Sequence, residues 1–426
     1  MVDPDASASR VLRDEEEAMA RIRAICFKTG PPSRVGIELE WTLHHTAAPA
    51  APLDAGIVRR ALGPHAPTAL DPTAPDTPIP AAALDPATLA AKTTPLSLPA
   101  GGQLTAEPGG QLEISTAPAA SLAELHTAVT TDINHLERML AAAGLGLGEH
   151  GIDPHRKPRR LLDTPRYAAM ERSFNARGPH GRTMMCSTAG LQVCLDAGTE
   201  SQLATRWAAV NALGPPLVAA FANSRRHAGR DTGWASARMA TWWGIDPRRS
   251  HPFDGAGTDP ATSWSRYALE APLLCLRRAN GSWDPPRGVT LRDWINGALP
   301  RPPTLDDLDY HLSTLFPPVR PRGYLEVRYL DAQSGPDWIA PAAVLSCLLA
   351  DDRTTQTALD LAAPTADRWL PAARAGLADR ALRRTAVAVL DLACRRLDRT
   401  GLSSAVRQQV IDIVQRRLRD AEQAEE

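Results

Sequence analysis

Carboxylate residues recur in short segments that alternate apolar and polar side chains. In residues 35–41, Glu38 and Glu40 share one face of a predicted strand, because successive side chains of a strand point to opposite sides. Two carboxylates on one face repel each other, so a sheet that points both into a cavity normally needs a cation between them. A single strand of this kind is more often a solvated outer face, and only recurrence of the pattern shifts the interpretation.

The pattern does recur in three further segments. Oxygen-rich faces on antiparallel strands with apolar backs suit hard cations such as Mg²⁺, which bind carboxylates together with phosphate oxygens. The four segments together therefore predict an antiparallel sheet with a polar, cation-binding face. The polar positions are Glu113 in residues 110–115 with Glu107 just upstream, Gln192 in residues 191–195, and Glu326 with Arg328 in residues 323–329.

Arginine must do most of the anion binding in this chain, because only Lys28, Lys92 and Lys157 among the 47 basic residues are lysines. Arg328 shares its strand face with Glu326, which is compatible with a structural ion pair and with a functional site. The neighbouring polar stretch 306–320, which ends at Arg320, favours a site.

A short helix is predicted over residues 236–243, and it is expected to expose Arg238. Arg238 and Trp242 then form either a stacked surface pair or part of the site. No Ser-His-Asp or Cys-His arrangement can be assembled from the sequence, so nucleophilic hydrolysis has no specific support. The sequence contains no Gly-Lys pair and therefore no P-loop.

Composition limits the kinds of partner. The net charge of −1 offers no basic field for nucleic acid. No apolar run approaches the roughly 20 residues that span a bilayer, and the N-terminus lacks the apolar core of a signal peptide, so we expect a cytoplasmic protein without membrane contact. The six cysteines are scattered without CxxC or zinc spacing, which predicts free thiols.

A length of 426 residues predicts one large domain or two, and the mixture of strands and helices indicates the α+β class. Residues 46–100, rich in Ala and Pro, are expected to form a surface excursion with small strands. The Ala- and Leu-rich stretch after residue 340 predicts helices packed on one side of the sheet. Other expected elements are helices at 11–27, 121–143, 163–175, 202–221 (kinked at Pro215 and Pro216) and 290–299, a hairpin of 103–105 with 111–115, and a strand at 267–276.

These segments resemble the glutamate-cysteine ligases over about residues 34–349. The likeness is closer to the plant and proteobacterial branch, and closest to the bacterial enzymes that begin ergothioneine synthesis. Two features depart from the family: the additional cysteine pair of the plant branch has no match, and residues 225–227 differ from the usual proline-containing run. The segments that carry the resemblance are 36–40, 107–115, 188–193, 222–224, 246–247 and, most specifically, 311–328.

The resemblance implies a glutamine-synthetase-like fold, in which a curved antiparallel sheet with helices on its convex side cradles Mg-ATP. We expect one catalytic domain, 1–426, with the site in 34–335 and C-terminal helices in 336–426. Arg328 would face the transferring phosphoryl group and Arg238 the glutamate or the phosphates, with Glu326 also at the reacting groups. The implied metal ligands are Glu38, Glu40, Glu107, Glu113 and Glu326, and the implied nucleotide contacts are Glu38, Gln192 and Arg320.

The implied reaction is ATP-dependent ligation of L-glutamate to L-cysteine by a monomer that uses Mg²⁺. ATP would phosphorylate the glutamate side chain, and the cysteine amine would displace phosphate, while the metal neutralises developing charge. Three alternatives stay open: ligation of glutamate to a different amine, a glycosidase with paired carboxylates, and a non-catalytic metal-dependent binding module.

Overall fold

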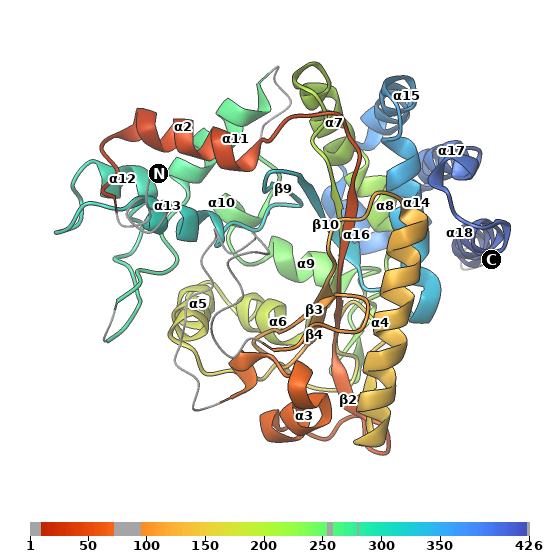
Figure 1. Ribbon diagram of the computed structural model, residues 1–426, viewed down its shortest axis with the longest axis horizontal. Coiled ribbons are helices and arrows are strands. Elements are labelled where there is room, and N and C mark those ends of the chain that lie inside the picture. The colour runs from red at the N-terminus through yellow and green to blue at the C-terminus, as the bar shows by residue number, and fades with distance from the viewer. Residues whose placement is uncertain (1–9, 72–94, 254–258, 279–280, 424–426) are drawn as a thin grey trace.

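A six-stranded antiparallel sheet lies at the centre of the protein (Figure 1). The computed structural model describes residues 10–71, 95–253, 259–278 and 281–423. The strand order is β3-β4-β1-β6-β10-β9, which brings together segments that are far apart in the sequence. The strands are β1 (Val35–Trp41), β3 (Gln103–Ala106), β4 (Leu112–Ser115), β6 (Gly190–Leu195), β9 (Val319–Pro321) and β10 (Leu325–Asp331).

The sheet forms where the alternating segments were predicted. The hairpin of β3 and β4 is confirmed, and its loop turns through Gly110, whose φ of 85° suits glycine. The apolar side chains of the strands form one buried face, which is the main reason why the register is defined. Its members are Ile37, Leu39, Leu112, Ile114, Leu191, Val193, Leu325 and Val327.

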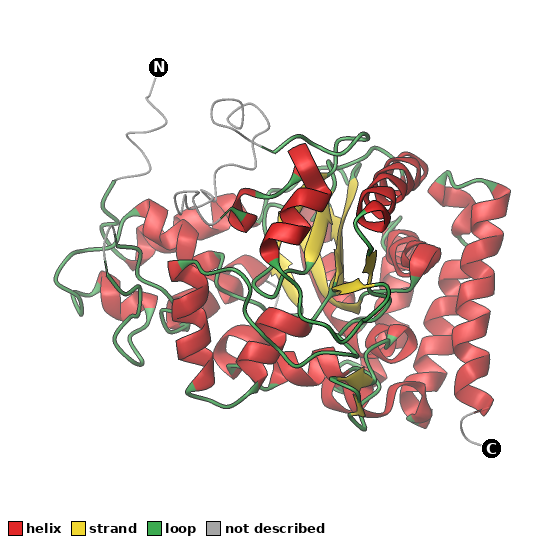
Figure 2. Ribbon diagram, turned by 90° about the horizontal axis from the view of Figure 1, so that it is seen from below, coloured by secondary structure: helices red, strands yellow, loops and turns green. Residues whose placement is uncertain are grey.

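Helices cover the apolar face of the sheet. The helix α4 (Leu122–Ala142) begins at Ser121, whose side chain accepts a hydrogen bond from the Glu124 N–H, as the sequence predicts. The C-terminal helices lie on the same side of the sheet as α4 (Figure 1), which confirms their expected place, and Figure 2 shows helices between the sheet and the C-terminus. They are α14 (Ile339–Leu348), α15 (Asp352–Ala362), α16 (Trp369–Ala375), α17 (Arg380–Cys394) and α18 (Ser404–Gln423).

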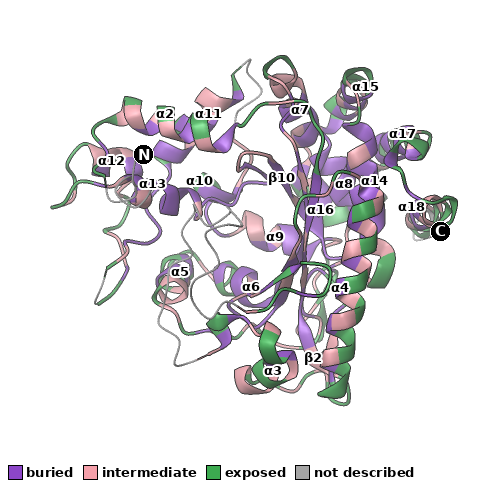
Figure 3. Ribbon diagram, viewed as in Figure 1, coloured by how far each residue is buried: buried purple, intermediate pink, exposed green. Residues whose placement is uncertain are grey.

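A second group of helices lies on the other side of the sheet, opposite α4 and α14 (Figure 1). Helices therefore flank both sides, whereas the sequence predicted them on one side. Figure 3 shows that the ribbon between the two groups is mostly buried. The helices are α2 (Glu15–Cys26), α5 (Pro165–Asn175), α6 (His180–Ser187), α9 (Ala237–Trp243), α10 (Pro247–Ser250), α11 (Pro260–Glu270), α12 (Leu291–Ile295) and α13 (Leu305–Leu312).

Shorter elements complete the described chain. No helix in the ranges described has both the length and the apolar character of a membrane span. The glycine-bearing segment after α4 forms a short strand that pairs with β2. These elements are β2 (Leu43–His45), β5 (Leu145–Leu147), α3 (Ala55–Leu62), α7 (Glu200–Ala212), α8 (Gly214–Phe221), β7 (Arg226–His227) and β8 (Arg230–Asp231).

Two sequence predictions about single elements were wrong. The strand expected at 267–276 begins as the end of α11, which Asp259 caps and Pro260 opens. The helix expected at 202–221 is two helices, because Pro215 and Pro216 lack the N–H that a continuous helix needs and instead open α8.

The Ala- and Pro-rich excursion also differs from expectation. Its apolar piece at residues 56–58 belongs to α3. Asp54 caps the start of this helix, because its side chain accepts a hydrogen bond from the Ile57 N–H. Residues 72–94 of that excursion lie outside the described residues. The helix predicted at 290–299 is present but ends at Ile295, just before Gly297 takes a φ of 90°.

Candidate active site

The antiparallel register brings predicted site residues from β1, β4 and β6 onto one face of the sheet. Glu38 lies directly opposite Gln192 of β6, and Glu40 lies directly opposite Glu113 of β4. Because the partners in an antiparallel ladder share a face, these four side chains form one polar patch on the side away from the apolar core. The residues of the recurring pattern therefore come together on one face of the sheet.

Gln192 links the two sides of this patch. Its Nε2 donates to Glu40 Oε1 over 3.0 Å and lies 3.5 Å from Glu113 Oε2, while its Oε1 accepts a hydrogen bond from Arg328 Nη1. The second oxygen of Glu40 accepts from the Gly190 N–H at 2.7 Å. The amide of Gln192 thus stands between carboxylates on one side and a guanidinium on the other.

The environment of the clustered carboxylates Glu38, Glu107 and Glu113 disfavours their charged form. Burial raises the pKa of Glu38 to about 7, and the charge of Glu326 adds to this effect. Burial also raises the pKa of Glu107 to about 7, with Glu40 as the next cause. The pKa of Glu113 lies well above its ordinary value because of burial and then Glu38. Like charges under partial burial explain all three shifts.

Glu326 has the opposite environment. It is fully buried, and its carboxylate accepts from Arg320 Nε at 2.6 Å, Arg328 Nη1 at 3.0 Å and Arg322 Nη1 at 3.3 Å. Burial by itself would raise the pKa of Glu326, but the three guanidinium groups outweigh it and hold that pKa far below the ordinary value. This half of the site is neutralised by the chain itself.

The strand geometry explains the arginine contacts. Arg320 of β9 is the direct cross-strand partner of Glu326, so the two side chains share a face. Arg328 stands in the stretch of β10 where the register against β6 shifts after Val327, and such irregularities re-aim side chains. The structure thus brings Glu326 to the predicted site, but as the centre of an arginine cluster and not as an open ligand.

Arg238 lies buried next to the arginine cluster around Glu326 and not on the surface. It is 2 % exposed, so the predicted exposure was wrong, because helix α9 lies against the sheet and turns this side chain inward. Its Nη2 donates to the Arg328 carbonyl oxygen at 2.9 Å, and burial lowers its pKa. A Cβ at Gly190 would stand 2.4 Å from Arg238 Nη2, so glycine there makes room for the guanidinium.

Two site residues carried no signal in the sequence. Arg166, at the start of α5, faces Glu107 closely enough to influence its pKa, and it donates to Ser313 Oγ at 3.1 Å. Asp331, at the end of β10, accepts from Ser224 Oγ at 2.7 Å and Ser236 Oγ at 2.9 Å. Neither contact follows from strand or helix periodicity, because each joins segments that only the tertiary fold brings together.

The donor set in the carboxylate half fits a hard cation. Oxygen ligands from several carboxylates are what Mg²⁺ prefers, and the raised pKa values show a charge that a cation would relieve. Among the described residues, however, no three His, Cys, Asp or Glu side chains form a ready-made metal site. The predicted Mg²⁺ ligands Glu38, Glu40, Glu107 and Glu113 are therefore neighbours without being an assembled site, and the assignment stays a prediction.

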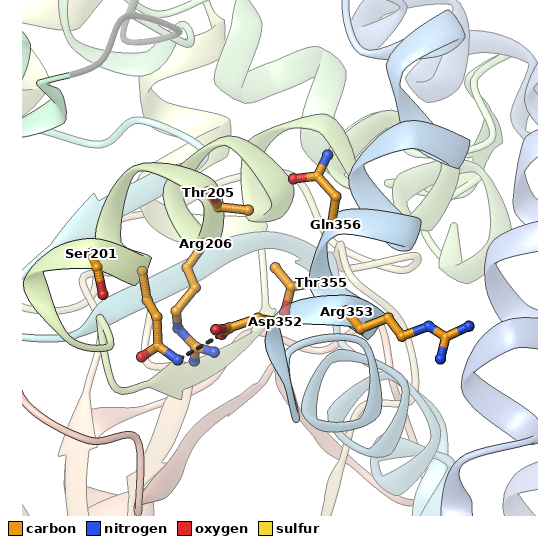
Figure 4. A pocket seen from close by; sticks show the side chains of 8 residues that line it. Ser201, Thr205, Arg206, Asp352, Arg353, Thr355 and Gln356 are labelled. Atoms are coloured by element: carbon orange, nitrogen blue, oxygen red, sulfur yellow. Dashed lines mark hydrogen bonds between the residues drawn. The ribbon is translucent and has the colours of Figure 1, made fainter.

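A separate polar hollow lies between α7 and α15 (Figure 4). Gln202 Nε2 donates to Asp352 Oδ1 at 2.6 Å across it, and the buried Arg206 donates to the Leu349 carbonyl oxygen at 2.7 Å. None of its lining residues belongs to the predicted site. The hollow is a seam between two helices that the Gln202–Asp352 hydrogen bond joins.

The six cysteines are all unpaired, as the sequence predicts. Cys194 lies opposite Glu326 in the register of β6 and β10, and burial raises its pKa well above the ordinary value. A thiol in this state is a poor nucleophile. The cysteines therefore add no nucleophile to the carboxylates and arginines of the site.

Comparison with known proteins relates this chain to ligases. The family model described as glutamate-cysteine ligase family 2 matches residues 34–426. Glutamate--cysteine ligase EgtA of Mycobacterium tuberculosis (strain ATCC 25618 / H37Rv) is 42% identical over 329 residues, which is 75% of each chain. The chloroplastic glutamate--cysteine ligase of Arabidopsis thaliana is 33% identical over 71% of this chain and 61% of its own.

A solved structure is similar at a much lower level. The glutamate--cysteine ligase of Francisella tularensis, determined in complex with AMP, aligns with 93% of this chain and 95% of its own, at 12% identity and a TM-score of 0.40. That similarity is too weak to assign any residue of the site.

Proposed function

Because the chain belongs to glutamate-cysteine ligase family 2 and is therefore an ATP-dependent ligase, we propose that it joins L-glutamate to L-cysteine and begins ergothioneine synthesis. The product would be γ-glutamylcysteine, formed through γ-glutamyl phosphate. The observation that carries this proposal is the division of one sheet face into a half rich in carboxylates with raised pKa values and a half rich in arginines (Glu113 and Gln192 beside Arg328).

The carboxylate half supplies the metal side of the reaction. Glu38, Glu40, Glu107 and Glu113 would hold Mg²⁺, which when bound supplies positive charge against the phosphate oxygens of ATP. Gln192 keeps Glu40 in place through its amide. The raised pKa values of Glu38 and Glu107 support a site that is incomplete without a cation.

The arginine half would orient the phosphoryl group that is transferred. Arg328 would make the two-pronged contact to the phosphoryl oxygens that a lysine cannot make. Its guanidinium is held by Glu326 and Gln192, so it is aimed before substrate arrives. Arg320 would lie against the nucleotide from the same cluster, with Glu326 between the two guanidinium groups.

Glu326 could serve in two ways within this proposal. The role that its contacts support is alignment of Arg320 and Arg328, because both bind its carboxylate. The metal-ligand role expected from the sequence requires the carboxylate to share an oxygen between an arginine and Mg²⁺. Either role makes the negative charge of Glu326 necessary for turnover.

The proposal also covers the wider organisation of the protein. We interpret residues 1–426 as one catalytic domain of a monomeric, cytoplasmic enzyme, with a sheet that curves around the nucleotide as in glutamine synthetases. The described core supports the single domain, because the larger of its two apolar clusters extends from Leu12 to Val414.

The decisive experiment is incubation of the purified protein with ATP, Mg²⁺ and L-glutamate, with and without L-cysteine. Phosphate release that depends on cysteine, together with a product of the mass of γ-glutamylcysteine, supports the proposal. Release with another amine and not with cysteine would keep the ligase class and replace the amine. No ATP turnover under any of these conditions would overturn the proposed reaction.

A further inference from the structure

Trp242 stands against both arginines of the site. The Cζ of Arg238 lies 5.7 Å from the centre of its ring and the Cζ of Arg328 lies 5.8 Å from it. Phe316 packs edge-on against the same ring at 5.6 Å. These contacts hold the indole by its ring, and none of them involves its N–H group.

Three buried N–H donors around this ring have no acceptor among the residues that the structure describes. They are Nε1 of Trp242, Nε of Arg238 and Nε of Arg328. Other nitrogens of the same guanidinium groups do have partners, since Arg328 Nη1 donates to Glu326 and Arg238 Nη2 donates to the Arg328 carbonyl oxygen. Buried donors without acceptors are rare in folded proteins and call for a specific explanation.

The chemistry of the three donors restricts what would satisfy them. An indole N–H and an arginine Nε–H can only donate, and the two guanidinium groups add positive charge. A metal ion or an ammonium group therefore does not fit here. The group that fits is an oxyanion, which accepts several hydrogen bonds and is stabilised by the nearby charge.

We propose that Trp242 is a substrate-binding residue whose indole N–H donates to an oxyanion of the substrates, together with Arg238 and Arg328. This inference rests on the proposed ligase function. The oxyanion is either a carboxylate of glutamate or the phosphoryl group in transfer, and steady-state kinetics separate the two. Trp242 would thus act by a hydrogen bond and not only as an apolar wall.

A matched pair of variants tests the hydrogen bond. Trp242→Phe and Trp242→His both replace the two fused rings of the indole by a single ring. The imidazole Nε2 takes the position of the indole Nε1 and keeps an N–H in one tautomer. The assays are run at pH 8.5, where imidazole is neutral. Trp243→Phe is the control, because Trp243 stacks on His251 at 4.6 Å and is not part of the site.

Trp242→Phe is expected to lose about 10- to 100-fold in kcat/KM, as is typical for one hydrogen bond to a charged group, and Trp242→His to recover a large part of this. A higher KM for glutamate alone identifies its carboxylate. A lower kcat with unchanged KM values identifies the phosphoryl group. The control stays near wild type.

Equal activity of Trp242→Phe, Trp242→His and Trp243→Phe would overturn the inference while leaving a ligase-active wild type, and so the proposed function, intact. A second measurement does not depend on stable variants. In wild-type protein with ¹⁵N-labelled tryptophan, one of the ten indole N–H resonances should move downfield on saturation with glutamate and a non-hydrolysable ATP analogue. No such movement would also overturn the inference.

Discussion

Glu38 and Glu326 are the same residue type on the same face of one sheet, yet their environments act in opposite directions. Burial raises the pKa of Glu38 to about 7, and the charge of Glu326 adds to this effect, although Arg322, Arg328 and Arg320 oppose it. Glu326 stands among three arginines, which hold its pKa far below the ordinary value in spite of complete burial. One half of the site carries charge that a bound cation would relieve, and the other half already contains its own cations.

This difference is what phosphoryl transfer between two anions requires. The nucleotide and the glutamate side chain both carry negative charge, so the site must supply positive charge that is already in place. Arg320, Arg322 and Arg328 supply this positive charge permanently, whereas the carboxylates would supply it only by binding a metal. Because lysine is nearly absent from the chain, the positive charge that the protein itself brings to this face comes from arginine.

Glu326→Gln is the largest expected effect, because it removes the charge on which three guanidinium groups depend. We expect turnover to fall by 10³-fold or more, a rough figure for losing more than one transition-state contact. Stability should fall as well, by roughly 3–5 kcal/mol, since breaking a buried ion pair leaves uncompensated charge. Turnover and thermal unfolding measure the two effects.

The sequence alone would predict that Glu326→Gln leaves the fold intact, because the apolar back of β10 is untouched. The arginine contacts change that expectation. An unchanged melting temperature would show that the arginines do not depend on Glu326. A loss of Mg²⁺ affinity in a titration would instead assign it to the metal.

Arg328→Lys should lose on the order of 10²-fold in kcat/KM in spite of the conserved charge. An ammonium group cannot keep the contacts to Glu326 and Gln192 and also reach two oxygens of a phosphoryl group. Arg225→Lys is the matched control, since Arg225 is exposed and pairs with Asp231 at the surface. Activity of Arg328→Lys within a few-fold of that control would remove Arg328 from the phosphoryl site.

Glu38→Gln tests the other half of the comparison, and its two effects should have opposite signs. Activity should fall steeply because a predicted metal ligand is lost. Stability of the metal-free protein at pH 8 should rise, by roughly 1 kcal/mol, since a neutral amide replaces a charge that its neighbours repel. Glu137→Gln, at an exposed position of α4, is the control. A destabilised Glu38→Gln would mean that the carboxylates are already compensated.

The parts of the molecule that could be predicted from sequence are those with local causes. Alternation of side chains indicated β1, β4, β6 and β10, and a cap at Ser121 indicated the start of α4. The site face followed from these, because all its carboxylates lie on strands or beside them.

The parts that could not be predicted depend on tertiary contacts. Arg238 was expected on the surface, and only the packing of α9 on the sheet shows that it is buried. The arginine cluster depends on β9 pairing with β10, and the position of Arg166 depends on α5 returning toward Glu107. The spacing of residues along the sequence does not predict these tertiary contacts.

The pH dependence of stability is the smallest expected effect and the one that tests the comparison most directly. Glu38 and Glu107 bind protons more tightly in the folded protein than in the unfolded chain, with pKa values of about 7 against an ordinary value near 4.5. Their contribution to stability is therefore complete below about pH 4.5 and is lost as the pH rises toward 7. Glu326 does not titrate in this window, because its pKa is lowered.

Thermal unfolding of the metal-free protein should consequently show a melting temperature that falls between pH 5 and pH 7.5. At pH 7.5, Mg²⁺ in the millimolar range should reverse the fall, because binding to the ionised carboxylates stabilises the folded state by mass action. Glu38→Gln should flatten the pH dependence and weaken the response to Mg²⁺, whereas Glu137→Gln should change neither. A melting temperature that rises through this range, or one that Mg²⁺ leaves unchanged at pH 7.5, would contradict an uncompensated carboxylate half beside a compensated arginine half.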